Sequence, residues 1–201
     1  MSIRTAIRDH GNIIVGITGR RGSGKSTFAA SIGGWRMGFA DPIRAVTEAV
    51  FGSQYRTAEE KAATDAYWQE RLGDDWSTGR KILQRTGTEV FRAGVHKDIW
   101  LYVMERRLLE LCNRPPMLIT IDDVRFDNEA EFLRDLGGTI VRVVNTNQPP
   151  NDDDHTSEAG ISDDLVNAEF RCATKGECQS IAKAFLFLLE KAKPLPAATA
   201  P

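Results

Sequence analysis

A glycine-rich stretch after an apolar run constrains this chain more than any other feature. Residues 19–26 read Gly-Arg-Arg-Gly-Ser-Gly-Lys-Ser and follow the apolar residues 13–18. Glycine permits backbone conformations in which successive amide N–H groups converge on phosphate oxygens, and a helix opening at Lys25 adds unpaired N–H groups and a partial positive charge. An expected strand, the characteristic spacing of glycines before Lys25 and an expected helix occur together here. We therefore interpret the stretch as a P-loop rather than a chance turn. We therefore expect the chain to bind a nucleoside triphosphate.

Three side chains at the start of that helix have distinct expected roles. Lys25 is expected to neutralise the β- and γ-phosphates, and the hydroxyl of Ser26 to coordinate Mg²⁺. Thr27 is expected to lie near the α-phosphate. The predicted cofactors are therefore ATP and Mg²⁺.

Length and composition favour a single globular domain. The 201 residues are 41% hydrophobic and 27% charged, with a formal net charge of -2, which is typical of an ordinary globular protein. We expect one domain over residues 1–192 and a disordered tail over residues 193–201, which are rich in proline and alanine. Without a strong excess of basic residues, stable nucleic-acid binding is not expected.

Neither end of the chain resembles a targeting or membrane segment. Residues 1–10 are polar, and the longest apolar run near the carboxyl end is residues 184–189, which is too short to span a bilayer. The three cysteines, Cys112, Cys172 and Cys178, lack paired spacing, so reduced thiols and a cytoplasmic location fit best.

Short apolar runs alternate with longer amphipathic segments after the P-loop. This alternation predicts a P-loop NTPase fold, a three-layer α/β/α arrangement around a mostly parallel five-stranded sheet. The predicted strands are residues 13–18, 35–39, 117–121, 139–144 and 167–172. The predicted helices are residues 25–32, 42–51, 79–93, 97–112, 127–136 and 177–192.

Two segments interrupt the alternation. Residues 52–78 contain a polar, helix-like stretch between glycines, and we interpret them as a small helical insertion. Residues 145–160 are rich in Asn, Pro and Asp, and we interpret them as a loop of lid length.

Two acids follow the apolar run 117–121. Carboxyl ends of parallel strands meet at one edge of an open α/β sheet, so Asp122 or Asp123 is expected near the phosphates and Mg²⁺. The alternative for either acid is that it caps the next helix. Arg125 and Glu129 follow closely, and their roles could be phosphate recognition or a surface salt bridge.

A basic face is predicted on the helix at residues 79–93. Arg80 and Gln84 are spaced to share one side of it, with Lys81 adjacent. Spacing alone favours a solvated surface for these three, and it favours a core position for Trp100.

Several segments, in this order, resemble one family, the bacteriophage deoxynucleoside monophosphate kinases, which are P-loop kinases related in fold to adenylate and guanylate kinases. The resemblance covers most of residues 13–172. It rests on the P-loop and on residues 39–44 (Phe-Ala-Asp-Pro-Ile-Arg), 83–89 (Leu-Gln-Arg-Thr-Gly-Thr-Glu), 98–100 (Asp-Ile-Trp), 122–129 (Asp-Asp-Val-Arg-Phe-Asp-Asn-Glu) and 155–158 (His-Thr-Ser-Glu).

The resemblance implies a set of site residues. The donor phosphates are expected to contact Gly22, Ser23, Gly24, Lys25, Ser26 and Thr27. The monophosphate pocket is expected to include Arg80, Lys81, Gln84 and Trp100, with Asp41 and Arg44 as further acceptor-side contacts. The resemblance also implies that Asp123, Arg125 and Glu129 face the reacting phosphates and the sugar, that Lys25, Arg125 and Asp123 are catalytic, and that Ser26 and Asp123 hold Mg²⁺.

The activity that the resemblance implies is transfer of the γ-phosphoryl group of ATP to a deoxynucleoside monophosphate, in the cytoplasm of the host if the chain is phage-encoded. Asn145 stands where similar proteins have a basic residue near the lid, so Arg142 and Arg171 are alternative sources of positive charge there. The apolar side chains of residues 97–112 could serve the core or a homodimer contact.

Other functions stay open from the residues alone. A P-loop kinase could act on dephospho-coenzyme A or on a modified pyrimidine nucleotide in phage DNA. A nucleotide-dependent switch or ATPase module is a further alternative. Against that last class, the chain lacks an Asn-Lys-x-Asp motif, and its second apolar strand ends in Asp-Asp rather than Asp-Glu.

Overall fold

The structure, a computed structural model, describes residues 2–147 and 160–192. Most of the expected lid-like loop and the whole expected tail lie outside the described residues. The chain divides into two compact units, one formed by Met1–Gly38 with Glu105–Pro201 and the other by Phe39–Met104. Each unit is described by itself below.

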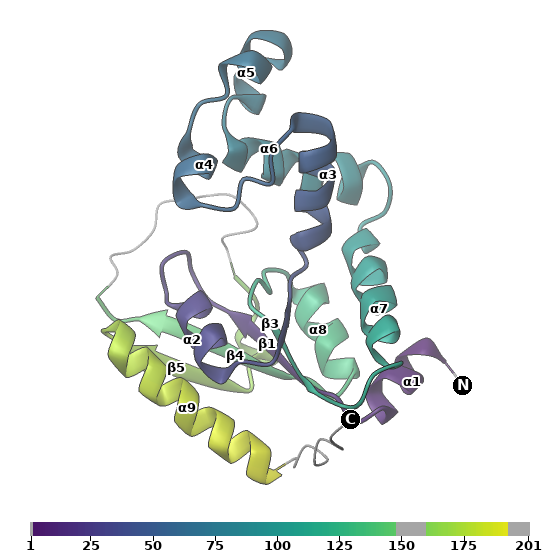
Figure 1. The fold of residues 1–201 in the computed structure, drawn as a ribbon, viewed down its shortest axis with the longest axis vertical. Coiled ribbons are helices and arrows are strands. Elements are labelled where there is room, and N and C mark those ends of the chain that lie inside the picture. The colour runs from purple at the N-terminus through teal and green to yellow at the C-terminus, as the bar shows by residue number, and fades with distance from the viewer. Residues whose placement is uncertain (1, 148–159, 193–201) are drawn as a thin grey trace. The chain divides into compact units, whose positions relative to one another are not determined.

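A five-stranded parallel sheet forms the centre of the first unit (Figure 1). The strand order is β2-β3-β1-β4-β5, and every neighbouring pair is parallel. The predicted parallel sheet is confirmed, because all five predicted strands are present. Their bounds are Ile13–Thr18 (β1), Trp35–Met37 (β2), Leu118–Ile121 (β3), Thr139–Asn145 (β4) and Ala168–Cys172 (β5).

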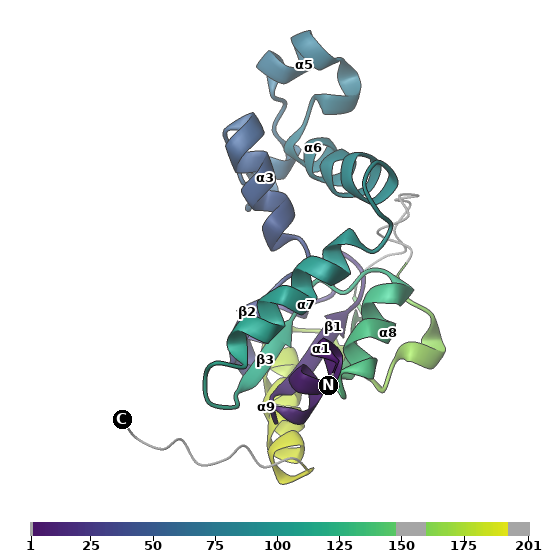
Figure 2. The ribbon, with the colours of Figure 1, turned by 90° about the vertical axis from the view of Figure 1, so that its right-hand side faces the viewer.

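Helices cover both faces of this sheet (Figures 1 and 2). One face carries α2 and α9, and the other carries α1, α8 and the part of α7 from Glu105 onward. The three-layer prediction is therefore confirmed. The helices span Ile3–Asp9 (α1), Lys25–Ile32 (α2), Ile99–Leu111 (α7), Asp127–Asp135 (α8) and Lys175–Ala192 (α9).

The core between the sheet and the α2/α9 layer is aromatic at its centre. Phe28 of α2 is fully buried, and its ring stacks on Phe170 of β5 at a centroid distance of 5.3 Å. Phe185 of α9 lies 5.9 Å from Phe28 and 5.3 Å from Phe170. These contacts fix the helix that begins at the P-loop against the strand at the edge of the sheet.

The opposite layer approaches the sheet closely at Gly16. A Cβ added there would lie 2.7 Å from Cδ1 of Ile140 and 2.9 Å from Cδ1 of Leu133 in α8. Only glycine therefore lets α8 pack against the centre of β1.

The helix α1 was not predicted. Ser2 caps it by accepting a hydrogen bond from the Thr5 N–H at 3.1 Å, and Ile7 is buried. Arg4 forms ion pairs with Glu105 and Asp135 at 3.0 and 3.3 Å. Seven residues with a single buried side chain give too short a periodic pattern for the sequence to reveal a helix.

The second unit is helical. Besides the start of α7, it contains α3, α4, α5 and α6, a short 3₁₀ helix (η1) and a π-helix (η2). The predicted insertion at residues 52–78 contains α4, α5 and η1. The bounds are Asp41–Phe51 (α3), Ala58–Ala62 (α4), Ala66–Leu72 (α5), Asp74–Trp76 (η1), Gly79–Arg85 (α6) and Thr86–Ala93 (η2).

The prediction of one α-helix over residues 79–93 was wrong beyond Arg85, where the chain continues as the π-helix. Gly87 lies against Ile43, whose Cδ1 would be only 2.9 Å from a Cβ added at Gly87. The Gly87 carbonyl accepts a 2.8 Å hydrogen bond from Nε1 of Trp100. Because π-helical hydrogen bonds span five residues rather than four, local pattern alone cannot distinguish the two helix types.

Within residues 2–147 and 160–192, no helix combines the length and the apolarity needed to cross a membrane.

We predict that Phe28→Ala destabilises the first unit by about 3–5 kcal/mol, because the surrounding rings cannot fill the space that it leaves. Urea unfolding followed by circular dichroism measures this change. Phe187→Ala is the matched control, since Phe187 is 56% exposed in the same layer, and it is expected to change the free energy of unfolding by less than about 0.5 kcal/mol. Equal effects of the two substitutions would contradict the packing described here.

A second prediction concerns alkaline pH and Tyr55. Burial, followed by the nearby charge of Asp65 and a hydrogen bond to it, raises the pKa of Tyr55 to about 12. Below pH 10 both the folded and the unfolded chain keep the phenol proton; between about pH 10 and 12 only the unfolded chain loses it. The free energy of unfolding should therefore fall in that window, by about 1–3 kcal/mol relative to Tyr55→Phe.

The measurement is urea unfolding of the wild type and Tyr55→Phe at several alkaline pH values. Tyr67→Phe serves as the control, because Tyr67 is exposed. If the wild type and Tyr55→Phe lose stability in parallel between pH 10 and 12, the environment assigned to Tyr55 is wrong.

Candidate active site

The glycines of the P-loop adopt left-handed backbone conformations at the end of β1. Gly22 and Gly24 have φ of 77° and 99°, values that favour glycine. Gly24 is the N-cap of α2, and its carbonyl accepts the Phe28 N–H at 2.9 Å. The loop therefore leads the chain from the central strand into the N-terminus of α2, where the helix dipole favours an anion.

Lys25 lies at the first turn of α2 and extends over the loop. Its Nζ donates hydrogen bonds to the carbonyl oxygens of Gly19 at 2.6 Å and Arg20 at 2.7 Å. Ser26 is exposed and Thr27 is half-buried on the same turn. The turn thus presents an ammonium group and hydroxyls at the position where the sequence predicted donor phosphates.

Ser23 occupies a different position from its neighbours. The residue is 2% exposed, and its Oγ has no hydrogen-bond partner among the described residues. Its backbone N–H donates to the Arg20 carbonyl at 3.1 Å. Ser23 is among the residues that line a cavity beside the loop, and its expected contact with the donor phosphates stays a prediction.

The two acids after β3 have different surroundings. Asp122 is ion-paired with Arg36 of β2. The N–H of Val124 donates to the carbonyl of Ile17 at 3.2 Å, which places Asp123 beside the end of β1 and hence next to the P-loop. The apolar run alone left the two acids equivalent, and the resemblance assigned Asp123; in the structure Asp122 pairs with Arg36 and Asp123 lies next to the P-loop.

Glu129 is buried and holds the backbone before α8. It is 2% exposed, and its Oε2 accepts the N–H groups of Arg125 at 2.8 Å and Phe126 at 3.3 Å. The resemblance implied that this side chain faces the reacting phosphates and the sugar, which stays a prediction. In the structure its carboxylate holds the backbone at Arg125 and Phe126.

The start of α8 is also tied to the chain that precedes β5. Both the N–H and the hydroxyl of Ser162 donate to the carboxylate of Asp127, at 2.8 and 2.6 Å. These bonds lower the pKa of Asp127 below its ordinary value.

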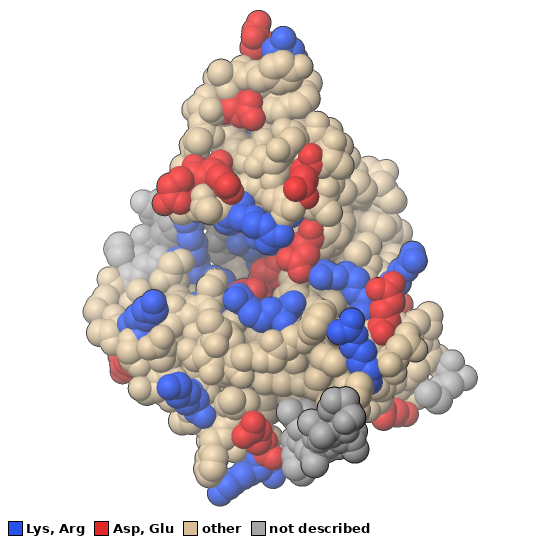
Figure 3. Space-filling model, in the orientation of Figure 1, with Lys and Arg blue, Asp and Glu red and all other residues tan. Residues whose placement is uncertain are grey.

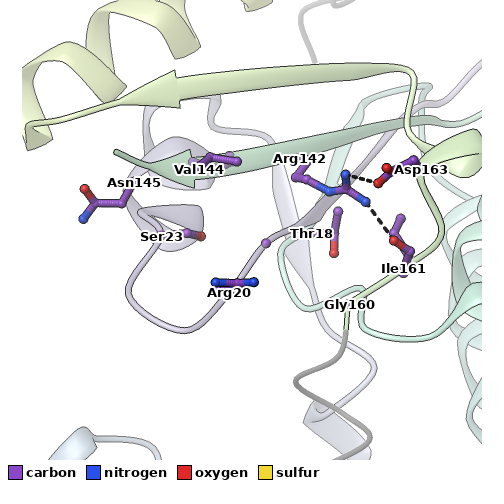
Figure 4. Close-up of a pocket in the computed structure, with 11 residues that line it drawn as sticks. Thr18, Arg20, Ser23, Arg142, Val144, Asn145, Gly160, Ile161 and Asp163 are labelled. Atoms are coloured by element: carbon purple, nitrogen blue, oxygen red, sulfur yellow. Dashed lines mark hydrogen bonds and ion pairs between the residues drawn. The ribbon is translucent and has the colours of Figure 1, made fainter. Parts of the chain in front are cut away.

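A cavity of about 380 Å³ opens between the P-loop, β4 and residues 160–163 (Figure 4). Arg142 of β4 points into it; Nη2 donates to the Ile161 carbonyl at 2.7 Å, and Nη1 pairs with Asp163 at the start of the short helix η4 (Asp163–Leu165). Glu169 lies 3.7 Å from the same Nη1. Thr18, Arg20 and Ser23 line the side that faces Arg142 (Figure 4).

Of the two arginines considered as lid-side charges, Arg142 therefore lines the cavity. Arg171 is 69% exposed and pairs with Glu169 at 2.8 Å. Asn145 lines the same cavity, and its Nδ2 contacts the Gly22 carbonyl at 3.4 Å. An amide at this position binds the P-loop backbone, which is a role that the sequence did not reveal.

Two thiols pack beneath the P-loop. The Sγ of Cys178 contacts the Gly24 carbonyl at 3.7 Å, and Cys172 is buried beside it. Burial, with a hydrogen bond to Cys172, raises the pKa of Cys178 to about 11. At neutral pH this thiol is protonated and contributes packing and a weak hydrogen bond to the loop.

In the second unit, the polar side chains of α6 form two groups, those bonded to nearby described residues and those that are not. Lys81 donates to the Asp74 carbonyl at 2.8 Å, and Arg85 pairs with Asp75 and, at 3.3 Å, with Glu89. Neither Arg80 nor Gln84 has a side-chain hydrogen bond to another described residue. Lys81 is thus bonded to the turn before its own helix, and its expected place in the monophosphate pocket stays a prediction.

The remaining predicted acceptor-side residues also lie in this unit. Asp41 and Arg44 form an ion pair at 3.5 Å on the first turn of α3. The Nε of Arg44 and the Oγ1 of Thr86 are buried without a hydrogen-bond partner among the described residues. Trp100 is 3% exposed, with its ring 5.1 Å from that of Phe91, as its spacing favoured, and the contact with the monophosphate that the resemblance implies stays a prediction.

Charged groups of both signs lie on the face of the molecule that Figure 3 draws. Figure 3 shows Lys and Arg side chains interspersed with Asp and Glu side chains on the face of the molecule that it draws. This mixture agrees with the net charge of -2. The segment of residues 155–158, which contributed to the resemblance, lies outside the described residues.

Comparison with known proteins identifies the family. A family model described as deoxynucleotide monophosphate kinase matches residues 45–168, which is more than half of the chain. A protein of Acanthamoeba polyphaga mimivirus, provisionally named a deoxynucleotide monophosphate kinase, is 32% identical over 167 residues, covering 74% of this chain and 82% of that protein.

Two phage proteins are similar over shorter stretches. The deoxynucleoside-5'-monophosphate kinase of Escherichia phage T5 is 38% identical over 96 residues, 45% of this chain and 37% of that protein. The deoxynucleotide monophosphate kinase of Enterobacteria phage T4 is 30% identical over 90 residues, 45% of this chain and 36% of that protein. The matches thus span little more than a third of each phage protein. On the family model and the mimivirus relative, this chain belongs to the deoxynucleotide monophosphate kinase family.

Proposed function

We propose that the protein transfers the γ-phosphoryl group of ATP to the 5'-phosphate of a deoxynucleoside monophosphate, giving ADP and a deoxynucleoside diphosphate. The observation that carries the proposal is the P-loop at the end of β1, with Lys25 over it and Asp123 following the neighbouring strand, in a chain of this family. Family membership supports a deoxynucleoside monophosphate as the acceptor, and the P-loop supports ATP as the donor.

The proposed chemistry needs positioning and charge neutralisation rather than a base. An oxygen of the acceptor phosphate forms the new bond to the γ-phosphorus, while the bond to the β–γ bridging oxygen breaks and ADP leaves with its electron pair. A nucleotide phosphate is already largely dianionic at neutral pH, so no side chain has to remove a proton from it. Lys25 and Arg125 are the cations proposed to neutralise the oxygens of the transferring group.

Mg²⁺ fits the oxygen donors available beside the loop. Ser26 supplies a hydroxyl and Asp123 a carboxylate, which are ligand types that Mg²⁺ prefers together with water and phosphate oxygens. Bound there, the ion would offset negative charge on the donor phosphates. The chain's own contribution is to hold these two side chains at the carboxyl edge of neighbouring strands.

The acceptor is proposed to bind the face of α6 formed by Arg80 and Gln84. This pair is favoured over Lys81 and Arg85 because the latter are already bonded to residues 74, 75 and 89. An arginine fork suits a phosphate, and a glutamine amide can both donate to and accept from a base. Arg44 and Thr86 add buried polar atoms in the same unit.

The function itself is tested by incubating the protein with Mg-ATP and each deoxy- and ribonucleoside monophosphate in turn, and quantifying the diphosphates formed. We expect ADP formation to require an added monophosphate. ATP consumption that is independent of every monophosphate would instead favour an ATPase or switch.

Lys25→Ala is predicted to lower kcat for phosphoryl transfer by at least about 100-fold, because one of the main charges on the transferring group is removed. Coupled measurement of ADP formation gives kcat, and circular dichroism reports the fold. Lys183→Ala, at an exposed lysine of α9, is the control and should retain normal turnover. A folded Lys25→Ala protein with near-normal turnover would contradict the proposed donor site.

Arg80→Ala is predicted to raise KM for the monophosphate by about tenfold or more while KM for ATP changes less than about twofold, since a charge-assisted hydrogen bond to phosphate is lost. Lys81→Ala is the matched control on the adjacent residue, and it should leave the monophosphate KM nearly unchanged. Equal effects of Arg80→Ala on both substrates, or a larger effect of Lys81→Ala on the monophosphate, would exclude the proposed face.

A further inference from the structure

Gly38, directly after β2, lies against the carboxylate of Asp123. A Cβ added at Gly38 would be 2.7 Å from Oδ2, 3.2 Å from Cγ and 3.3 Å from Oδ1 of that side chain. All three atoms of the carboxyl group therefore pack against a backbone position that has no side chain. Any larger residue at position 38 has to displace the carboxylate.

The backbone of Gly38 is itself held in place. Nη1 of Arg107, on α7, donates a 2.9 Å hydrogen bond to the Gly38 carbonyl. Gly38 is buried, and Arg107 is half-buried. These contacts all lie within the first unit.

The neighbouring acid, Asp122, pairs with Arg36 of the adjacent strand β2. The carboxylate of Asp123 packs closely on Gly38. Close packing restricts where the oxygens of the Asp123 carboxylate can lie. Such a restriction suits a group that must present its oxygens to a cation at one position.

We propose that Gly38 and Arg107 are positioning residues for Asp123, and that they set the affinity of the site for Mg²⁺ bound with ATP. This inference rests on the proposed function, in which Asp123 contacts that ion. It adds two residues to the site that neither the P-loop pattern nor the acidic pair indicated.

The decisive substitution is Gly38→Ala. The φ of Gly38 lies outside the left-handed range in which L side chains are strained, so an alanine acts there mainly through the contact of its Cβ with Asp123. Gly176→Ala is the matched control, because a Cβ at Gly176 meets no atom within 4 Å and its φ is likewise outside that range.

Two measurements separate positioning from a general structural effect. The first is the dissociation constant for ATP in EDTA, which does not involve the metal; it is compared with the constant measured in saturating Mg²⁺. The second is the Mg²⁺ concentration that gives half-maximal phosphoryl transfer. Gly38→Ala should raise that concentration about 10- to 100-fold, the range typical of disturbing residues that orient a metal ligand. Its dissociation constant for ATP in EDTA should stay within about twofold of the wild type, and Gly176→Ala should match the wild type in both measurements.

A double-mutant cycle tests whether Gly38 acts through Asp123. Asp123→Ala removes the atoms that the new Cβ would meet, so Gly38→Ala should have no further effect on the Mg²⁺ requirement in that background. The same double variant remains informative if Gly38→Ala alone fails to fold. Arg107→Met, which adds no bulk at position 38, should also raise the Mg²⁺ requirement, and Arg107→Lys should partly restore it.

Three results would overturn the inference. One is a folded Gly38→Ala protein with the Mg²⁺ requirement of the wild type. Another is an equal loss of ATP affinity with and without Mg²⁺, and the third is full additivity with Asp123→Ala. If the wild type binds ATP more tightly with Mg²⁺ but phosphorylates no monophosphate, the proposed function fails, while the binding comparison still decides the role of Gly38.

Discussion

The parallel pairing of β1 with β3 is the constraint on which the donor side of the site depends. Both strands are buried along their whole length, and they run in register so that their carboxyl ends meet at one edge. The bond from the Val124 N–H to the Ile17 carbonyl extends this pairing past the end of β3. As a result, backbone hydrogen bonds alone place Asp123 next to the loop that we propose binds phosphate.

The sequence alone predicted the scaffold well because the signals for it are local. Each of the five strands is a short apolar run, and their observed bounds lie within two residues of the predicted ones. The spacing of Gly19, Gly22 and Gly24 before Lys25 was likewise sufficient to predict a turn from strand to helix, since glycine is needed at such positions for steric reasons. The family resemblance agreed with the comparison by family model and relatives.

The details of the site could not be predicted, because they depend on which partner each polar group finds in space. Asp122 and Asp123 are equivalent in a linear pattern; the Arg36 ion pair distinguishes them. Arg80 and Lys81 are adjacent basic residues, yet only Lys81 reaches the carbonyl of Asp74. The resemblance implied that Glu129 faces substrate, and the sequence alone gave no sign that its buried carboxylate accepts two backbone N–H groups, those of Arg125 and Phe126.

The π-helix of the second unit determines how this part of the chain can change in length. A π-helical turn holds one more residue between hydrogen-bonded partners than an α-helical turn does. The Gly87 carbonyl near the start of this helix accepts the hydrogen bond from Trp100, so deleting one residue from Thr86–Ala93 is expected to disturb that bond. Because α6 runs directly into this helix at Thr86, we expect length variation among related chains to fall outside residues 79–93.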